Sequence, residues 1–187
     1  MKGILTAVAG LTLGMLVVAA PADAQRSTTQ TRTGPVFGVA AGLSQPTGDL
    51  GDFADLGFNV TGTLDIAPQA IPFPLRFDVM FNRWGGDGFD GSVRSLAAMA
   101  NAVFNIPTQS GGLNPYLLGG LGIYNNAVSV DEGDDPDSET DLGINLGGGF
   151  RFPLSGFDTY VEARYHNVFG GDENDASFLP IVFGFRF

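Results

Sequence analysis

The chain contains one histidine, His166, and Ser177 follows it across a short predicted loop. A serine beside a histidine can act as nucleophile and general base, as in serine hydrolases. Alternate residues of an extended segment share a face. His166 shares its row with Glu162 and Arg164, whereas Ser177 lies on the row opposite to that of Phe178. No G-x-S-x-G or H-x-S pattern occurs, so we expect no enzyme here and a hydrogen-bonding role for His166 in the interior.

Carboxylates gather in one long predicted loop between two strands. The cluster comprises Asp131, Glu132, Asp134, Asp135, Asp137, Glu139 and Asp141. Such hard oxygen ligands suit Ca²⁺ or Mg²⁺, but the spacing lacks the central glycine and the distant glutamate of an EF-hand. We therefore predict a solvated acidic loop with no cofactor and no resident metal, and keep its first five members as candidate cation ligands.

Eight charged residues, four basic and four acidic, lie instead within the alternating segments of the chain, not counting Arg83 and Asp141 at segment ends. They are Asp65, Arg76, Asp78, Arg151, Asp158, Glu162, Arg164 and Arg186. A balanced set of this kind suits a narrow, poorly hydrated interior in which each charge needs a partner. We predict that these residues form a charge network inside a barrel and that the apolar rows face outward.

The segments that must position these residues alternate apolar and polar side chains with the period of a β-strand. We predict eight strands, at Val36–Ser44, Phe58–Ile66, Leu75–Arg83, Ser95–Asn105, Tyr116–Asn125, Asp141–Phe152, Phe157–Asn167 and Phe178–Phe187. Both faces of Tyr116–Asn125 are apolar or glycine, so its register cannot be read. Trp84 ends the third strand, where an amphipathic indole suits a membrane interface.

Alternation alone does not separate a membrane barrel from a soluble barrel whose apolar face points inward. A soluble barrel needs a charged exterior, yet the strands carry only the eight balanced charges and the sole lysine of the chain is Lys2. An arginine turned to lipid at mid-membrane would cost roughly 2–4 kcal/mol. We therefore predict an all-β, eight-stranded antiparallel transmembrane β-barrel.

The N-terminus has the composition of a secretory signal peptide: Lys2, an apolar run of residues 4–18 and an A-x-A site that ends at Ala24. We expect cleavage between Ala24 and Gln25, a flexible leader over residues 25–34 and a barrel domain over residues 35–187. The chain has no cysteine, which excludes disulfides and thiolate metal sites. Its formal net charge of −11 disfavours a nucleic-acid partner.

The last ten residues, FLPIVFGFRF, place Leu179, Ile181, Phe183, Phe185 and Phe187 in one unbroken apolar row. This ending resembles that of the bacterial outer-membrane β-barrels. Residues 35–187 are similar to the small barrels of the OmpA and OmpX type. The resemblance rests on the signal peptide, GLSQPTGDL after the first strand, PYLLGGLGIY, VEARYHNVFGG and the terminal FGFRF.

The resemblance implies a protein of the bacterial outer membrane in contact with lipid and lipopolysaccharide. It also implies insertion by the barrel-assembly machinery, which reads Phe183, Phe185 and Phe187. We expect a structural or surface-interaction role in adhesion or in the envelope, with a filled lumen and acidic extracellular loops. A further hypothesis is that divalent cations bridge the acidic loop to lipopolysaccharide phosphates. The alternatives are a small passive porin-like channel and, after it, a lipid-modifying enzyme.

Overall fold

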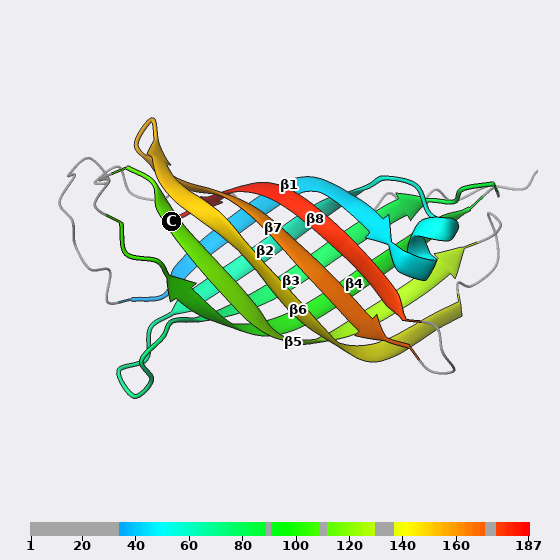
Figure 1. Cartoon of the computed structure of the whole chain (residues 1–187), viewed down its shortest axis with the longest axis horizontal. Helices are drawn as coiled ribbons and strands as arrows, with labels where there is room; N and C mark the ends of the chain where they lie inside the picture. Colours follow the sequence, from blue (N-terminus) through cyan, green and yellow to red (C-terminus); the bar gives the residue numbers. More distant parts are fainter. Residues whose placement is uncertain (1–33, 89–90, 109–111, 130–136, 171–174) are drawn as a thin grey trace, which may run out of the picture. The chain divides into compact units, whose positions relative to one another are not determined.

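Eight antiparallel strands close on one another to form a barrel in the computed structural model (Figure 1). The structure describes residues 34–88, 91–108, 112–129, 137–170 and 175–187, without the side chain of Asp137. The strands are β1 (Val36–Thr47), β2 (Gly57–Ile66), β3 (Leu75–Gly85), β4 (Ser92–Asn105), β5 (Asn114–Ser129), β6 (Asp137–Leu154), β7 (Phe157–Phe169) and β8 (Ala176–Arg186). The predicted fold class is therefore confirmed. The predicted signal peptide, its cleavage site and residues 25–33 of the leader lie outside the described residues.

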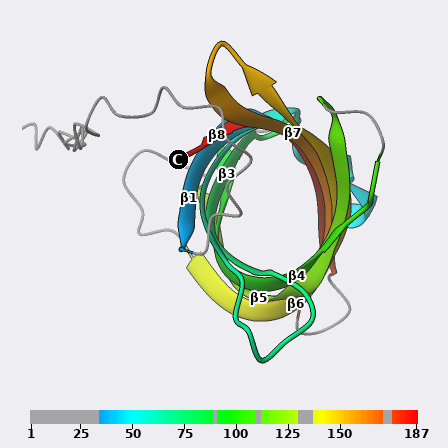
Figure 2. The ribbon, with the colours of Figure 1, turned by 90° about the vertical axis from the view of Figure 1, so that its left-hand side faces the viewer.

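Neighbours in sequence are neighbours in the barrel, and β1 also pairs with β8 to complete the ring (Figure 2). This last pairing runs from Gly38 opposite Arg186 to Thr47 opposite Ser177. The backbone groups of Phe37 and Phe187 exchange two hydrogen bonds of 3.0 and 2.9 Å at its end. Closure leaves no free strand edge, which a barrel in lipid requires because the bilayer core offers no water to satisfy the backbone.

The barrel turns its apolar side chains outward and its charges inward. Leu121 and Leu146 on the outer surface are 68% and 69% exposed, whereas Arg76 and Arg164 in the lumen are 0% and 4% exposed. This is the reverse of a water-soluble barrel, and it confirms the predicted facing of the rows. The outer surface is therefore suited to acyl chains.

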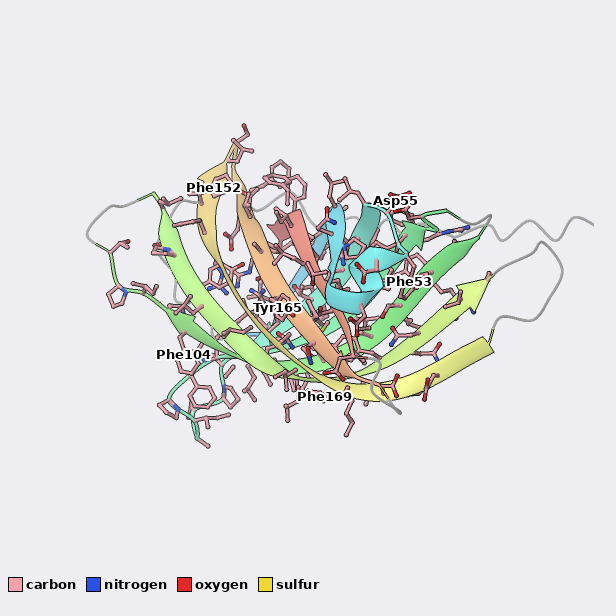
Figure 3. All side chains as sticks on the ribbon, turned by 45° about the vertical axis from the view of Figure 1, so that its right-hand side comes forward. Phe53, Asp55, Phe104, Phe152, Tyr165 and Phe169 are labelled. Carbon is pink, nitrogen blue, oxygen red and sulfur yellow. The ribbon has the colours of Figure 1, made fainter. Side chains whose placement is uncertain are left out.

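Exposed aromatic side chains lie toward both ends of the outer surface (Figure 3). Phe104 and Phe152 lie toward one end and Phe53 toward the other, with Tyr165 and Phe169 between them. At the end that carries the C-terminus, Phe183 packs edge-on against Phe185, with ring centroids 5.2 Å apart. Aromatic residues at both interfaces are typical of transmembrane barrels.

A short 3-10 helix, η1 (Gly48–Asp52), lies in the segment that was predicted as a loop after the first strand. It stands at the end of the barrel opposite the C-terminus (Figure 1), here called the outer end. The residues that follow η1 pair with the end of β3 through a bridge between Ala54 and Gly86. Among the described residues, no helix has the length and apolar character needed to span a bilayer.

The strands differ from the prediction mainly at the outer end. β5 extends to Ser129 and β6 begins at Asp137, so Glu139 belongs to a strand and not to a loop, and Asp141 lies within the strand that it was predicted to begin. β5 also has a definite register, with Leu121 outside and Leu118 and Tyr124 inside. The polar and glycine-rich composition of these segments hid both features.

The outward rows lead to a prediction at two leucines of the outer surface. Leu121 lies at the middle of β5 and Leu154 beside the turn that ends β6. Leu121→Arg should lower the free energy of unfolding by about 2–4 kcal/mol and Leu154→Arg by only about 0–1 kcal/mol, because the cost of an arginine falls from the bilayer midplane to its interface. Urea unfolding in phospholipid vesicles measures both, and equal losses would contradict the lipid-facing assignment.

Candidate functional site

The eight charges predicted to face the lumen meet in one continuous network inside the barrel. At its centre, the guanidinium of Arg76 on β3 contacts Asp65 on β2 (Nε to Oδ1, 3.0 Å) and Glu162 on β7 (Nη1 to Oε2, 2.7 Å). Arg164 joins Glu162 to Asp78, whose Oδ2 lies 2.5 Å from its Nη1. These five side chains are almost wholly buried, so each charge is compensated by its neighbours and not by water.

The network continues to the inner end of the barrel, where the chain terminus lies. Arg186 on the closing strand binds Asp65 (3.3 Å) and Asp158 (2.9 Å). Arg151 lies 3.9 Å from the same Asp65 carboxylate and donates a 2.7 Å hydrogen bond to Asn105. The Asp158 side chain is 41% exposed, so the network reaches the surface only at this end.

Neutral side chains also donate hydrogen bonds to the buried carboxylates. The hydroxyl of Tyr116 donates to Glu162 (2.7 Å), and the amide of Asn101 donates to Asp78 (2.8 Å). The guanidinium of Arg151 also stacks over the Tyr116 ring at 4.3 Å. The sequence reasoning missed these partners. Alternation along β4 places Asn101 on the inward face, but the apolar and glycine composition of β5 gave no register for Tyr116.

Glycines make room for the lumen tyrosines. Tyr116 lies directly across from Gly149, and Tyr160 lies directly across from Gly184. A Cβ at either glycine would collide with the facing ring. The inward glycines of β6 and β8 therefore allow large rings to occupy a barrel whose interior is only wide enough for side chains.

An aromatic layer lies between the ion network and the outer end. The rings of His166 and Phe178 stack at 4.8 Å, and Phe178 packs edge-on against Trp84 at 5.1 Å. Tyr124 packs edge-on against Phe178 and places its hydroxyl 2.9 Å from Nδ1 of His166. Leu50 of η1 belongs to the same buried cluster. Rings and aliphatic side chains thus fill the lumen directly above the ion network.

The prediction that Trp84 lies at a membrane interface is wrong. Its side chain is 1% exposed, and its indole N–H donates to the carbonyl of Ser44 at 3.0 Å inside the barrel. Trp84 shares the inward phase of Asn82 and Met80 on β3. The alternation along β3 would therefore have placed Trp84 in the lumen.

His166 and Ser177 do not contact one another. His166 is fully buried between Tyr124 and Phe178. The hydroxyl of Ser177 donates to the carbonyl of Thr47 (3.0 Å) and accepts a hydrogen bond from the Thr47 hydroxyl (3.1 Å). In the described part of the barrel, this serine is therefore engaged with β1 and not with an imidazole.

Two further sets of predicted site residues are the acidic cluster and the C-terminal phenylalanines. Asp131, Glu132, Asp134 and Asp135 fall outside the described residues, as does the side chain of Asp137. Phe183 and Phe185 lie on the outward row of β8, and Phe187 follows that strand at the inner end. Phe185 also packs edge-on against Phe157 of β7, with ring centroids 5.9 Å apart.

Comparison with solved structures shows a shared fold. Neisserial surface protein A (NspA) is 19% identical, with 81% of this chain and 95% of that chain covered and a TM-score of 0.64. The outer membrane enzyme PagL is 13% identical, with 82% and 98% covered and a TM-score of 0.54. A comparison with curated proteins finds no match.

A family description agrees with this architecture over nearly the whole sequence. The family described as "Outer membrane protein beta-barrel domain" matches residues 10–187. The closed barrel and its lipid-facing apolar rows are the features of a transmembrane β-barrel. The chain therefore belongs to the outer membrane protein beta-barrel domain family and is a protein of the bacterial outer membrane.

Proposed function

We propose that this protein is a non-enzymatic, non-conducting barrel that stabilises the cell envelope and presents its outer end as an interaction surface. The observation that carries the proposal is the filling of the lumen at two levels. The ion network fills its inner half, and the aromatic layer blocks it directly above the network. The filled lumen offers no route through the barrel, and the charges of the network neutralise one another. We therefore assign the function to the exposed ends of the barrel.

The two-level filling argues against the alternative of a passive channel. Eight strands enclose a space only wide enough for side chains. Tyr116, Tyr160 and Arg76 together occupy its inner part, with the guanidinium 5.4 and 5.6 Å from the two ring centroids. An ion that entered would have to displace a buried arginine that is held by two carboxylates.

The alternative of a lipid-modifying enzyme has a structural neighbour in PagL, an outer membrane enzyme, but that likeness concerns the fold alone. The positions of the candidate catalytic residues favour the non-enzymatic role. His166 does not contact Ser177, the candidate nucleophile, whose hydroxyl is bound to Thr47. The imidazole also lies wholly inside the lumen, away from the lipid-facing surface. A lipid substrate would reach neither side chain without opening the barrel wall.

The hairpin of β5 and β6 supports an interaction role at the outer end. These strands contain 16 and 18 residues, whereas a tilted strand needs about 9–11 to span a bilayer. The end of β5 and the start of β6 lie at the same end of the barrel as η1 (Figure 1). The hairpin carries Glu139 and Asp141 at this end. The candidate cation ligands at residues 131–137 precede them in the sequence, in the connection between the two strands.

Lipopolysaccharide is the membrane partner that we propose for this end, through its phosphates. Arg83 on β3 and Arg94 on β4 lie directly opposite one another on the outward face, and both are exposed. Neither forms an ion pair with another residue in the described ranges. Like charges directly opposite one another are unfavourable alone, and arginine binds phosphate through paired hydrogen bonds. Divalent cations held by the acidic connection would add a second link to the same phosphates.

The path to the membrane completes the proposal. A signal peptide cleaved between Ala24 and Gln25 would deliver the chain to the periplasm. The barrel-assembly machinery would then recognise the closing strand through Phe183, Phe185 and Phe187. The outward position of the first two, on a strand that pairs on both sides, supports their availability before closure and their burial in lipid after it.

The orientation can be tested by labelling two serines replaced by cysteine. The chain has no cysteine of its own, so Ser138→Cys at the start of β6 and Ser155→Cys in the β6–β7 turn each give a single thiol. A membrane-impermeant maleimide should label position 138 in intact cells and position 155 only after the outer membrane is permeabilised. The reverse pattern would contradict the proposed interaction surface.

Conductance distinguishes the proposed role from that of a channel. The folded barrel, checked by its heat-modifiable gel mobility, should show no sustained large openings in planar-bilayer recordings, because both levels of the lumen are occupied. Sustained, reproducible conductance steps from the purified protein would exclude a filled lumen and favour the porin-like alternative.

The network itself can be tested at its centre and at its edge. Glu162→Gln should lower the free energy of unfolding by roughly 3–5 kcal/mol, because Arg76 and Arg164 would both lose a buried counter-ion. Asp158→Asn removes the same type of charge at the exposed edge and should cost below about 1 kcal/mol. Urea unfolding in phospholipid vesicles compares the two. A small loss at both positions would show that the ion pairs do not hold the barrel together.

A further inference from the structure

A cavity of about 170 Å³ lies at the outer end of the lumen, above the aromatic layer. We call it the vestibule. Its floor is formed by Trp84, Val168 and Phe178, all buried residues of the inward rows. Val93 on β4 and Leu50 of η1 form part of its wall. The vestibule is thus an apolar chamber separated from the ion network by the rings beneath it.

Two carboxylates stand at the edge of the vestibule. Glu139 and Asp141 occupy alternate positions of β6, so both side chains lie on the inward face where that strand rises past the aromatic layer. Asn126 lines the cavity opposite Glu139. Within the described residues neither carboxylate forms an ion pair, and no lysine, arginine or histidine lines the cavity.

The combination of an apolar floor and unpaired acidic groups at one side selects the charge of an occupant. Two like charges on one face of a strand repel one another. The arginines of the network lie below the aromatic layer, and Arg94 on the neighbouring part of the wall lies on the outward face, away from the cavity. A positive group placed between Glu139 and Asp141 would relieve this repulsion. The aromatic rings of the floor would also attract a cation through their negative faces.

We propose that the vestibule binds a small organic cation, an ammonium group attached to an apolar body about the size of one aromatic ring. The size follows from the volume, since an apolar cavity of about 150 Å³ in another protein holds benzene. The apolar body rests on Trp84 and Phe178, and the ammonium group lies at the acidic edge. This site is independent of the proposed interaction role of the outer surface, and it needs no passage through the lumen.

Trp84 gives the experiment a direct signal, because it is the only tryptophan in the chain and forms the floor. The barrel in lipid nanodiscs is titrated with benzylammonium, benzyl alcohol and benzoate, which share a ring and differ in charge. Benzylammonium should change the tryptophan fluorescence saturably, with an affinity at least tenfold higher than that of benzyl alcohol. Benzoate should give no saturable change.

Two variants test the two parts of the site. The double variant Glu139→Gln and Asp141→Asn should remove the advantage of benzylammonium over benzyl alcohol, whereas Asp158→Asn at the opposite end should preserve it. Ala176→Leu, which adds bulk at a half-buried lining residue, should weaken both ligands. Each variant is first checked for heat-modifiable mobility.

Equal binding of benzylammonium and benzyl alcohol to the unaltered barrel would reduce the vestibule to an unselective apolar cavity and overturn the proposal. The absence of any saturable fluorescence change would overturn it as well. Retention of the tenfold preference in the double variant would show that the carboxylates do not recognise the cation, and would also contradict the site.

Discussion

A charge inside this barrel must meet an opposite charge, because the lumen is too narrow to hydrate it. Arg76 and Arg164 satisfy this requirement by sharing Glu162, and each then takes a second carboxylate from another part of the network. The contacts join residues of β2, β3, β6, β7 and β8. A slip of one residue in any of these strands would turn its charges toward lipid, so the network specifies the register as well as filling the space.

The aromatic layer solves the same filling problem without charge. Trp84, Phe178 and Tyr124 come from β3, β8 and β5, and their rings meet edge to face as aromatic pairs prefer. The only hydrogen-bonding groups that they bring into the lumen find partners at Ser44 and His166. An uncharged layer directly above a paired network avoids placing any further charge in a medium that cannot solvate it.

The barrel was predictable from the sequence because lipid and lumen impose opposite compositions on alternate residues. The pattern was clear on β3 and β7, where Arg76, Asp78 and Glu162 mark one face. It failed on β5, where Gly119, Gly120 and Gly122 removed the contrast between the faces. It also failed where β5 and β6 leave the membrane, since a strand in water has no reason to keep one apolar row.

Other features depend on distances between strands that no single segment encodes. Alternation placed eight charges inside, but the choice of Glu162 and Asp65 as the partners of Arg76 follows from the stagger of the closed ring. Trp84 was misjudged for a different reason, since its position at a strand end was weighed above its phase. For a barrel residue near an interface, the phase decides between lipid and lumen, and the position decides only the depth.

The distribution of charge between the lumen and the ends has a consequence for the outer surface. The network contains four arginines and four carboxylates and is neutral as a unit, so the formal charge of −11 resides outside it. The aromatic layer also separates Glu139 and Asp141 from Arg164, which is already occupied by Glu162 and Asp78. The acidic residues of the outer end therefore cannot be neutralised from within the barrel. Apart from Arg83 and Arg94 on the outward face, the compensating charge must come from outside, as a bound cation, a cationic ligand or the phosphate-bound ions of the surrounding lipid.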